Sequence, residues 1–475
     1  MANFDYSCEP VRDILFIDVK SFYASVECKM RGLDPLDTML VVMSKADNTG
    51  NGLILASSPL AKKVLGISNV TRANNLPNHP DLIIAPPRMN LYVKENMKIN
   101  NIFRNYVADE DLLIYSIDES ILDVTQSLNL FVPSKSKTRS EKRWELARII
   151  QRDIYRQTGL YVTVGIGDNP LLAKLALDNE SKHNKSLKAE WKYKDVETKV
   201  WGIPDITDFW GINTRTQKRL YRIGVDTVYD LANLSPSQKL SLFNGKSGLG
   251  VIGKQIYHHA NGIDRTILSE EMPKTKSKSY GNSQVLPRTY YLQDEIELVV
   301  KEMAEQVAAR IRRHHCLTQC VALFIGGAYD GERGFHHQMK VYATDNTKKL
   351  TESCLYIFRK YYNGFPVRHV GVTYSNLLFT EVRQLDLFTD PEEEIKQQNI
   401  DRIIDKIREK YGFTALIHAS SKLEGGRSVA RSNLVGGHAG GLAGVNNTSQ
   451  IENEGVSSVL QSTSLRNKLI EAKRK

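Results

Sequence analysis

The sequence lacks the features that mark secreted and membrane proteins. Its five cysteines, in 475 residues, form no even disulfide framework and fit a reducing compartment. No apolar run approaches the roughly 20 residues that cross a bilayer. The acidic start, Phe4 to Glu9, has neither the basic nor the apolar region of a secretory signal. We therefore expect a cytoplasmic protein that has no membrane partner.

Charge of one sign is only moderately in excess. The 64 lysines and arginines exceed the 54 aspartates and glutamates by a net charge of +10, which is often no more than a soluble surface. Two basic, serine-rich segments, residues 134–143 and 273–280, say more, because their side chains suit the phosphate backbone of a nucleic acid. The first segment is equally consistent with a mobile surface loop.

A first acidic stretch carries a strong chemical signal. Ile14 to Ile17 is a continuous apolar run, typical of a buried strand, and Asp18 falls where that strand should end. Ser21 can then cap a helix that runs through Glu27. A strand end, an acid and a helix N-terminus in succession place a metal ligand beside backbone N–H groups that can hold phosphate oxygens. The pattern suits a nucleoside triphosphate that arrives with magnesium.

A second acidic stretch lies a hundred residues later. Residues 111–125 are predicted to form two short apolar strands around Asp118 and Glu119, and a hairpin tip lets these neighbouring side chains point the same way. Asp18, Asp118 and Glu119 can then converge on two magnesium ions about 3.5–4 Å apart. Each acid taken singly is more simply a turn or cap residue. Their joint occurrence beside apolar strands favours the metal site.

These motifs resemble those of the Y-family translesion DNA polymerases, closest to the UmuC-type UV-damage-repair polymerases of Gram-positive bacteria, over roughly residues 10–425. The resemblance implies an α+β multidomain right hand with palm, fingers, a helix-hairpin-helix thumb and a βαββαβ little finger. It implies a metal-binding triad of Asp18, Asp118 and Glu119, with the Val19 carbonyl as a further ligand for two Mg²⁺ ions. The implied activity is low-fidelity DNA synthesis past damaged bases, without proofreading.

The chain is too long for one core, so several domains are expected. Combined with the resemblance, the pattern along the chain predicts palm (1–21 and 86–185), fingers (22–85), thumb (186–268), basic linker (269–282), little finger (283–383), a sliding-clamp motif (384–388), a helical segment (389–424) and a mostly disordered tail (425–475). The little finger is predicted as a strand from Ser283, helix 292–314, strands 319–326 and 334–343, helix 346–362 and strand 367–378, before a helix at 391–411.

The resemblance also implies contacts to the incoming dNTP. Phe22 and Tyr23 resemble the aromatic pair under the sugar, with Tyr23 as the steric gate against a 2′-hydroxyl; core packing is the alternative for both. The fingers carry Lys62 in place of an arginine fork. The phosphate-binding lysine falls one residue late, at Lys182, with Ser181 at the nominal position. A solvated surface lysine is the alternative for Lys182.

Primer–template DNA is the implied partner of two further regions. Gly211 and Gly224 lie in the turns of the expected helix-hairpin-helix, where backbone N–H groups can hold phosphates. The linker lysines Lys274, Lys276 and Lys278 are expected to follow the DNA backbone.

A protein partner is implied by the pentapeptide after the last strand. It resembles the bacterial sliding-clamp-binding motif, in which Leu385, Leu387 and Phe388 fill an apolar pocket and Gln384 bonds at its rim. Docking of this segment on the little finger itself is the alternative. A recombinase filament or accessory subunits are further possible partners. Two rival functions stay open: a non-catalytic lesion-binding or regulatory subunit, and a nucleotidyl cyclase that shares the palm.

Two motifs are weaker. Residues 248–253 match the GxGxxG dinucleotide pattern, but the required buried strand does not precede them, and a flexible thumb loop near the primer is preferred. His314, His315, Cys316 and Cys320 have a spacing that matches no common structural zinc site.

Overall fold

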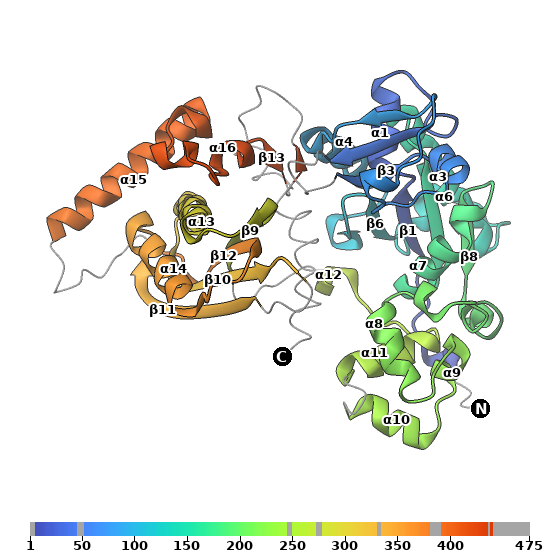
Figure 1. The fold of residues 1–475 in the computed structure, drawn as a ribbon. Helices are drawn as coiled ribbons and strands as arrows, with labels where there is room; N and C mark the ends of the chain where they lie inside the picture. Colours follow the sequence, from blue (N-terminus) through green and yellow to red (C-terminus); the bar gives the residue numbers. More distant parts are fainter. Residues whose placement is uncertain are drawn as a thin grey trace. The chain divides into compact units, whose positions relative to one another are not determined.

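The computed structural model describes residues 5–44, 52–244, 249–271, 278–329, 334–380, 391–435 and 438–439. The chain divides into two compact units, and Figure 1 draws the helices and strands of both. Of the described residues, the first unit holds 5–38, 92–244 and 249–271, and the second holds 39–44, 52–91, 278–329, 334–380, 391–435 and 438–439. No helix within the described ranges is long and apolar enough to cross a membrane.

The first unit contains the palm sheet, whose strands are ordered β5-β6-β1-β7-β8. Its central strand pairs antiparallel with both neighbours and is buried nearly throughout, which accounts for the uninterrupted apolar run that the sequence shows there. The strands are β1 (Ile14–Val19), β5 (Leu112–Ile114), β6 (Glu119–Asp123), β7 (Val162–Gly167) and β8 (Lys188–Trp191). The predicted pair of short strands around the second acidic stretch is therefore confirmed.

Helices of the first unit surround this sheet. They are α1 (Phe22–Met30), α4 (Met89–Phe103), α5 (Leu128–Phe131), α6 (Arg139–Thr158), α7 (Pro170–Asn179) and α12 (Leu268–Glu271). Helix α7 packs so closely on β7 that a Cβ at Gly165 would lie only 1.9 Å from the carbonyl oxygen of Ala173. Glycine at this position therefore allows the close contact. Residues 22–38, which were expected with the fingers, belong to this unit.

The thumb helices share one hydrophobic core with α7, which contributes Leu171, Leu172 and Leu175. They are α8 (Thr214–Tyr221), α9 (Val228–Ala232), α10 (Pro236–Phe243) and α11 (Val251–Ala260). The dinucleotide-like motif runs into α11, and a Cβ at Gly253 would lie 2.7 Å from the Leu242 carbonyl oxygen. That glycine therefore allows two helices to approach closely, and this part of the motif is helix rather than loop.

The second unit holds the expected βαββαβ little finger, with sheet order β11-β10-β12-β9. Its elements are β9 (Tyr280–Tyr290), α13 (Gln293–Arg313), β10 (Leu317–Gly327), β11 (Phe335–Thr344), α14 (Thr347–Tyr361) and β12 (Val367–Leu378). The same unit includes β2 (Leu40–Ser44), β3 (Leu53–Ser57), α3 (Pro59–Leu65) and β4 (Ile83–Ala85) of the fingers, in a sheet ordered β3-β2-β4.

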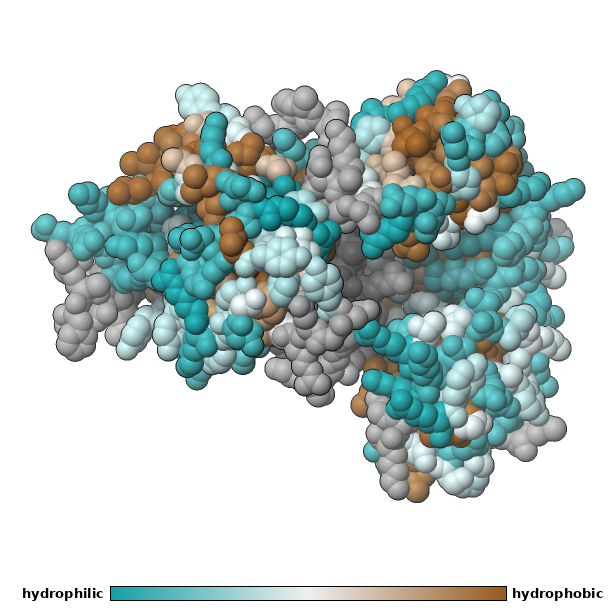
Figure 2. Space-filling view, in the orientation of Figure 1, coloured by the Kyte–Doolittle hydropathy of each residue, from teal (hydrophilic) through white to brown (hydrophobic). Residues whose placement is uncertain are grey.

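The C-terminal segment is more ordered than expected. Helix α15 (Pro391–Tyr411) has the predicted bounds, and α16 (Ser428–Arg431), β13 (Leu434–Val435) and β14 (His438–Ala439) follow it. The tail 425–475 was expected to be mostly disordered, and its first residues, 425–435, are ordered, since the Tyr290 hydroxyl donates to the Gly425 carbonyl at 2.9 Å. Residues 440–475 lie outside the described ranges. Figure 2 shows hydrophobic residues on α15, where Ile395, Ile400 and Ile403 are exposed.

Candidate active site

Three carboxylates meet where β1 ends and β6 begins. Asp18 and Glu119 are direct partners in the antiparallel ladder, so their side chains leave the same face of the sheet. Asp118 is joined to the same edge, because the Val19 N–H donates to its carbonyl at 2.9 Å. The Ser116 hydroxyl orders the turn, donating to Asp118 Oδ1 at 2.8 Å and accepting the Glu119 N–H at 3.0 Å. The structure thus brings together the three acids that the sequence singled out.

The electrostatics of this edge favour a cation. Burial raises the pKa of Asp18 to about 7, a shift that Lys182 opposes and that Asp118 and Glu119 reinforce. Burial, followed by the charge of Glu119, also raises the pKa of Asp118. Negative charge is therefore concentrated where water screens it poorly. All the donors are oxygen atoms, which is the set that hard divalent ions such as Mg²⁺ prefer.

Two lysines form ion pairs with these acids and neutralise part of their negative charge. Lys182 Nζ lies 2.9 Å from Asp18 Oδ2, and Lys174 Nζ lies 2.6 Å from Glu119 Oε1. Within the described ranges, no group of three or more His, Cys, Asp or Glu side chains is already arranged around a metal position. The donor set fits a divalent ion once the ammonium groups withdraw. Lys182 therefore lies beside the acids, and its proposed role as a phosphate-binding lysine stays a prediction.

An aromatic stack lies beside the acids. Tyr23 stacks on Tyr92 with ring centroids 4.5 Å apart and planes inclined by 16°, and the buried Phe22 packs against both rings. The Tyr92 hydroxyl donates to the buried Glu27 at 2.8 Å, which fixes this second ring. Burial, followed by the charge of Asp118, raises the pKa of Tyr23. Tyr23 therefore lies near the acid cluster as a rigid, neutral ring.

One local expectation is wrong. Ser21 occupies the N-cap position of α1, but its side chain forms no cap hydrogen bond. The residue adopts a left-handed backbone conformation with φ of +50° and ψ of +48°, whereas a capping serine normally has an extended backbone. Strained backbone of this kind is found at functional sites, and here it lies three residues after Asp18.

Sequence reasoning missed two groups beneath the acids. Lys174 and Asp178 lie on α7, and Asp178 bonds both to Lys174 and to Lys182. A signal was available, since Lys174, Asp178 and Lys182 follow one another at a spacing of four residues. Lys174 is also the one charge within the otherwise apolar run Pro170–Leu177. Such a charge is rarely buried unless it is paired.

The remaining predicted dNTP, DNA and clamp contacts lie in other parts of the sequence. Lys62 lies on α3 and is half-buried, in the second unit, and the described part of the linker includes Lys278, whose Nζ lies 5.3 Å from the Phe379 ring centroid. Gly211 and Gly224 are exposed and have positive φ, but the Gly224 N–H already donates to the Tyr221 carbonyl. Outside the described residues lie Lys274, Lys276 and the clamp motif of Gln384, Leu385, Leu387 and Phe388.

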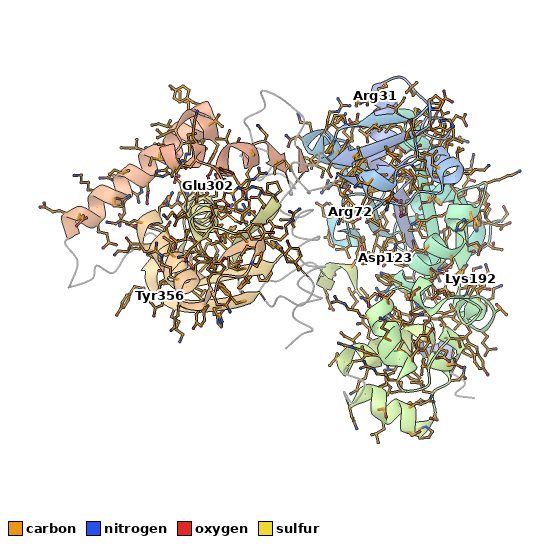
Figure 3. The ribbon with its side chains drawn as sticks, viewed as in Figure 1. Arg31, Arg72, Asp123, Lys192, Glu302 and Tyr356 are labelled. Atoms are coloured by element: carbon orange, nitrogen blue, oxygen red, sulfur yellow. The ribbon has the colours of Figure 1, made fainter. Side chains whose placement is uncertain are left out.

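The opposite end of β1 also carries a charge cluster. Arg143 is 1% exposed and donates to Asp13, to Asp168 Oδ1 at 2.9 Å and to Glu190 Oε1 at 3.2 Å. Lys192, labelled in Figure 3, adds an ion pair to Glu190 at 3.3 Å. Arg143 belongs to the basic segment 134–143, for which phosphate contact and a mobile surface loop were equal alternatives. Its burial makes it a structural residue instead.

Comparison with known proteins agrees with this arrangement. Residues 17–178 match the impB/mucB/samB family, and residues 277–387 match the C-terminal domain of that family. The first match includes all three acids, together with Lys174 and Asp178, and it ends four residues before Lys182. The second covers the little finger.

Full-length relatives extend the comparison. A Bacillus subtilis protein that carries the name "Putative UV-damage repair protein UvrX" is 38% identical, over 91% of this chain and 99% of its own length. DNA polymerase IV 2 of the same organism is 33% identical, over 90% of this chain and 98% of its own length. A solved Y-family DNA polymerase chimera of Dbh and Dpo4 shares the fold, with a TM-score of 0.61 and 20% identity, over 78% of this chain and all of its own. This chain is therefore a Y-family DNA polymerase of the impB/mucB/samB family.

Proposed function

We propose that this polymerase performs translesion synthesis, the low-fidelity, template-directed extension of a primer past damaged bases, without proofreading and in an SOS-like response to UV damage. The observation that carries the proposal is the meeting of Asp18, Asp118 and Glu119 at one edge of the palm sheet. Lys182 beside them supplies positive charge for a triphosphate. The relative named for UV-damage repair supports damaged DNA as the template.

Two Mg²⁺ ions are the proposed cofactor, held by Asp18, Asp118, Glu119 and the Val19 carbonyl. When bound, such ions lower the pKa of the attacking hydroxyl and neutralise charge on the triphosphate. The primer 3′-hydroxyl attacks the α-phosphorus in line, a new P–O bond forms, and the bond to pyrophosphate breaks. The carboxylates would hold the two ions, and the ions would position the reacting oxygens; such positioning is the main contribution that a protein makes to phosphoryl transfer.

Other side chains of the site bind and select the dNTP. We propose that Lys182 moves from Asp18 to the triphosphate and that Lys62 adds further charge from the fingers. Tyr23, held by its stack on Tyr92, excludes a 2′-hydroxyl and so selects deoxyribonucleotides.

The proposed partners are primer–template DNA, dNTPs and a sliding clamp. Gly211 and the linker lysines Lys274, Lys276 and Lys278 contact the DNA backbone. The pentapeptide at 384–388 binds the clamp through Leu385, Leu387, Phe388 and the Gln384 amide. Tethering to a ring on DNA raises the local concentration of the polymerase at the primer end. A recombinase filament or accessory subunits are further partners of this proposal, and the cytoplasm is its compartment.

The deciding experiment is primer extension by the purified protein with Mg²⁺ and four dNTPs, on undamaged and thymine-dimer templates. We expect Asp118→Asn to lower the rate by about 10³-fold or more, because one carboxylate of the metal site is lost. DNA binding, measured by fluorescence anisotropy, should stay within about twofold, because the substituted group contacts the metals rather than the DNA backbone.

Rival functions give different results in the same assay. A non-catalytic lesion-binding subunit would bind the template but extend no primer. A nucleotidyl cyclase would convert a nucleoside triphosphate without primer or template. Undiminished extension by Asp118→Asn would place the catalytic site elsewhere.

A further inference from the structure

A continuous chain of ion pairs joins the two ends of the acid cluster through α7. Glu119 contacts Lys174 at 2.6 Å, Lys174 contacts Asp178 at 3.0 Å, Asp178 contacts Lys182 at 2.9 Å, and Lys182 contacts Asp18 at 2.9 Å. Charges alternate along the chain. Asp178 is its midpoint and is the one carboxylate in it that the proposed chemistry does not use.

Within this chain of ion pairs, Lys174 is buried and Lys182 is partly exposed to solvent. The side chain of Lys174 is 7% exposed and its ammonium lies 4.8 Å from the Phe16 ring centroid, whereas Lys182 is 36% exposed. Burial would lower the pKa of Lys174, but Glu119 and Asp178 outweigh it and raise that pKa. Burial would likewise raise the pKa of Asp178, but the two lysines lower it. Both lysines therefore stay charged, and each is shared between Asp178 and one metal-binding acid.

Because Asp178 shares both lysines, the free energy needed to displace them from the metal-binding acids is lower. A divalent cation that binds Asp18 and Glu119 has to displace ammonium groups from these carboxylates. Without Asp178, the displaced ammonium of Lys174 would be left buried and unpaired, which is strongly unfavourable. With Asp178 in place, both lysines keep a carboxylate partner after they leave the acids. The net positive charge around the site is also lower by one, which favours a cation.

We propose that Asp178 is a positioning residue that holds Lys174 and Lys182 for exchange, and so sets the affinity of the acid cluster for divalent metal. The inference rests on the proposed polymerase function and adds to it a residue outside the metal-binding set. The simpler alternative is that Asp178 only stabilises α7 through two pairs at a four-residue spacing. Pairs that only stabilised the helix would not alter metal affinity.

The test measures metal binding without turnover. The full-length protein is bound to a primer–template with a dideoxy-terminated primer, and Mn²⁺ binding is followed by electron paramagnetic resonance. We expect Asp178→Asn to raise the dissociation constant for Mn²⁺ about tenfold, which corresponds to about 1.4 kcal/mol. Asp178→Glu keeps the charge and should stay within about threefold of the wild type.

A matched control removes one carboxylate charge from the same sheet. Asp123, labelled in Figure 3, ends the strand that Glu119 begins, about 13 Å away at the usual rise per residue. It accepts from the Thr125 N–H at 3.0 Å rather than from a lysine of the site. Asp123→Asn should therefore leave Mn²⁺ affinity within about twofold.

Two results would overturn the inference. One is an Asp178→Asn protein that binds Mn²⁺ as the wild type does. The other is an equal loss in Asp178→Asn and Asp178→Glu, which would indicate a packing role. Primer extension by the wild type, measured in parallel, tests the proposed function separately. Extension with unchanged Mn²⁺ affinity in Asp178→Asn refutes only the role of Asp178.

Discussion

The two ends of strand β1 carry similar charges but use them differently. At the Asp13 end, the guanidinium of Arg143 bonds to three carboxylates and is 1% exposed. At the Asp18 end, two ammonium groups are shared among the carboxylates, and Lys182 is 36% exposed. Both clusters are anchored on the same strand of the palm sheet. We expect the Arg143 cluster to stay paired and the lysines at the Asp18 end to exchange carboxylate partners.

The chemistry of the cations explains this difference. A guanidinium offers several donors in a rigid planar fork and cannot lose its charge in a protein, so it fixes carboxylates in place. An ammonium is a compact charge on a flexible stem, and it can leave a carboxylate without disturbing the backbone. The Asp13 end therefore orders the sheet. The proposed function needs the opposite at the Asp18 end, where the acids would pass to a metal ion and Lys182 to a phosphate.

Matched substitutions at the two ends should change stability in opposite directions. Asp13→Asn removes one of the carboxylates that pair with the buried guanidinium of Arg143. We expect this substitution to lower the free energy of unfolding by about 3–5 kcal/mol. Asp18→Asn removes a carboxylate whose charge its surroundings disfavour, so the metal-free protein should gain at least about 1 kcal/mol at pH 8. Urea denaturation in EDTA measures both, and a loss of similar size at both ends would break the comparison.

The aromatic stack beside the Asp18 end sharpens the functional side of the comparison. Tyr23→Ala should reduce discrimination against ribonucleotides by about 10²-fold, because the ring that excludes the 2′-hydroxyl is gone. The ratio of kcat/KM for dNTP and NTP incorporation measures this. Tyr23→Phe keeps the ring and serves as the control. Unchanged selectivity in Tyr23→Ala would assign the gate to another residue.

Acid pH should weaken metal binding at the Asp18 end. Because the pKa of Asp18 is raised to about 7, protons compete with the metal below that value, and half-saturating Mg²⁺ should rise about tenfold between pH 8 and pH 6. Titration of primer extension with Mg²⁺ at several pH values measures this dependence. A half-saturating concentration that does not vary with pH would argue against a raised pKa.

The same shift predicts a stability change with a definite sign. The folded state binds the Asp18 proton more tightly than the unfolded chain, whose pKa is near 3.8. The metal-free protein should therefore lose stability as pH rises from about 4 to about 7. Asp18→Asn should remove that part of the slope, whereas Asp123→Asn should keep it.

Much of the fold could be predicted because the local patterns are strong. The apolar run Ile14 to Ile17 is a buried strand, and alternating and helical periods predicted the order of the little finger and the bounds of α15. One local expectation failed, because Ser21 forms no side-chain cap. The first residues of the mostly disordered tail, 425–435, are ordered by contacts with α13 and β9, which the local composition does not reveal.

The candidate site divides in the same way. Asp18, Asp118 and Glu119 follow from the sequence, because an acid beside an apolar strand is locally recognisable. The partners of these acids do not follow, since Lys174 and Lys182 differ from other lysines only in what lies near them. The spacing of Lys174, Asp178 and Lys182 was visible, but it could equally have described an exposed helix face.

By itself, the sequence determined the acids, the strands that carry them and the order of elements in the little finger, because these depend on residue type and local period. Only the tertiary structure decided which charges are paired and buried. Arg143 and Lys182 both come from basic or polar stretches of sequence, yet Arg143 is buried at the Asp13 end of β1 and Lys182 lies beside Asp18. The reason is physical, since burial and partner distance depend on how β7 and α7 pack, and these quantities set the strength of each charge interaction.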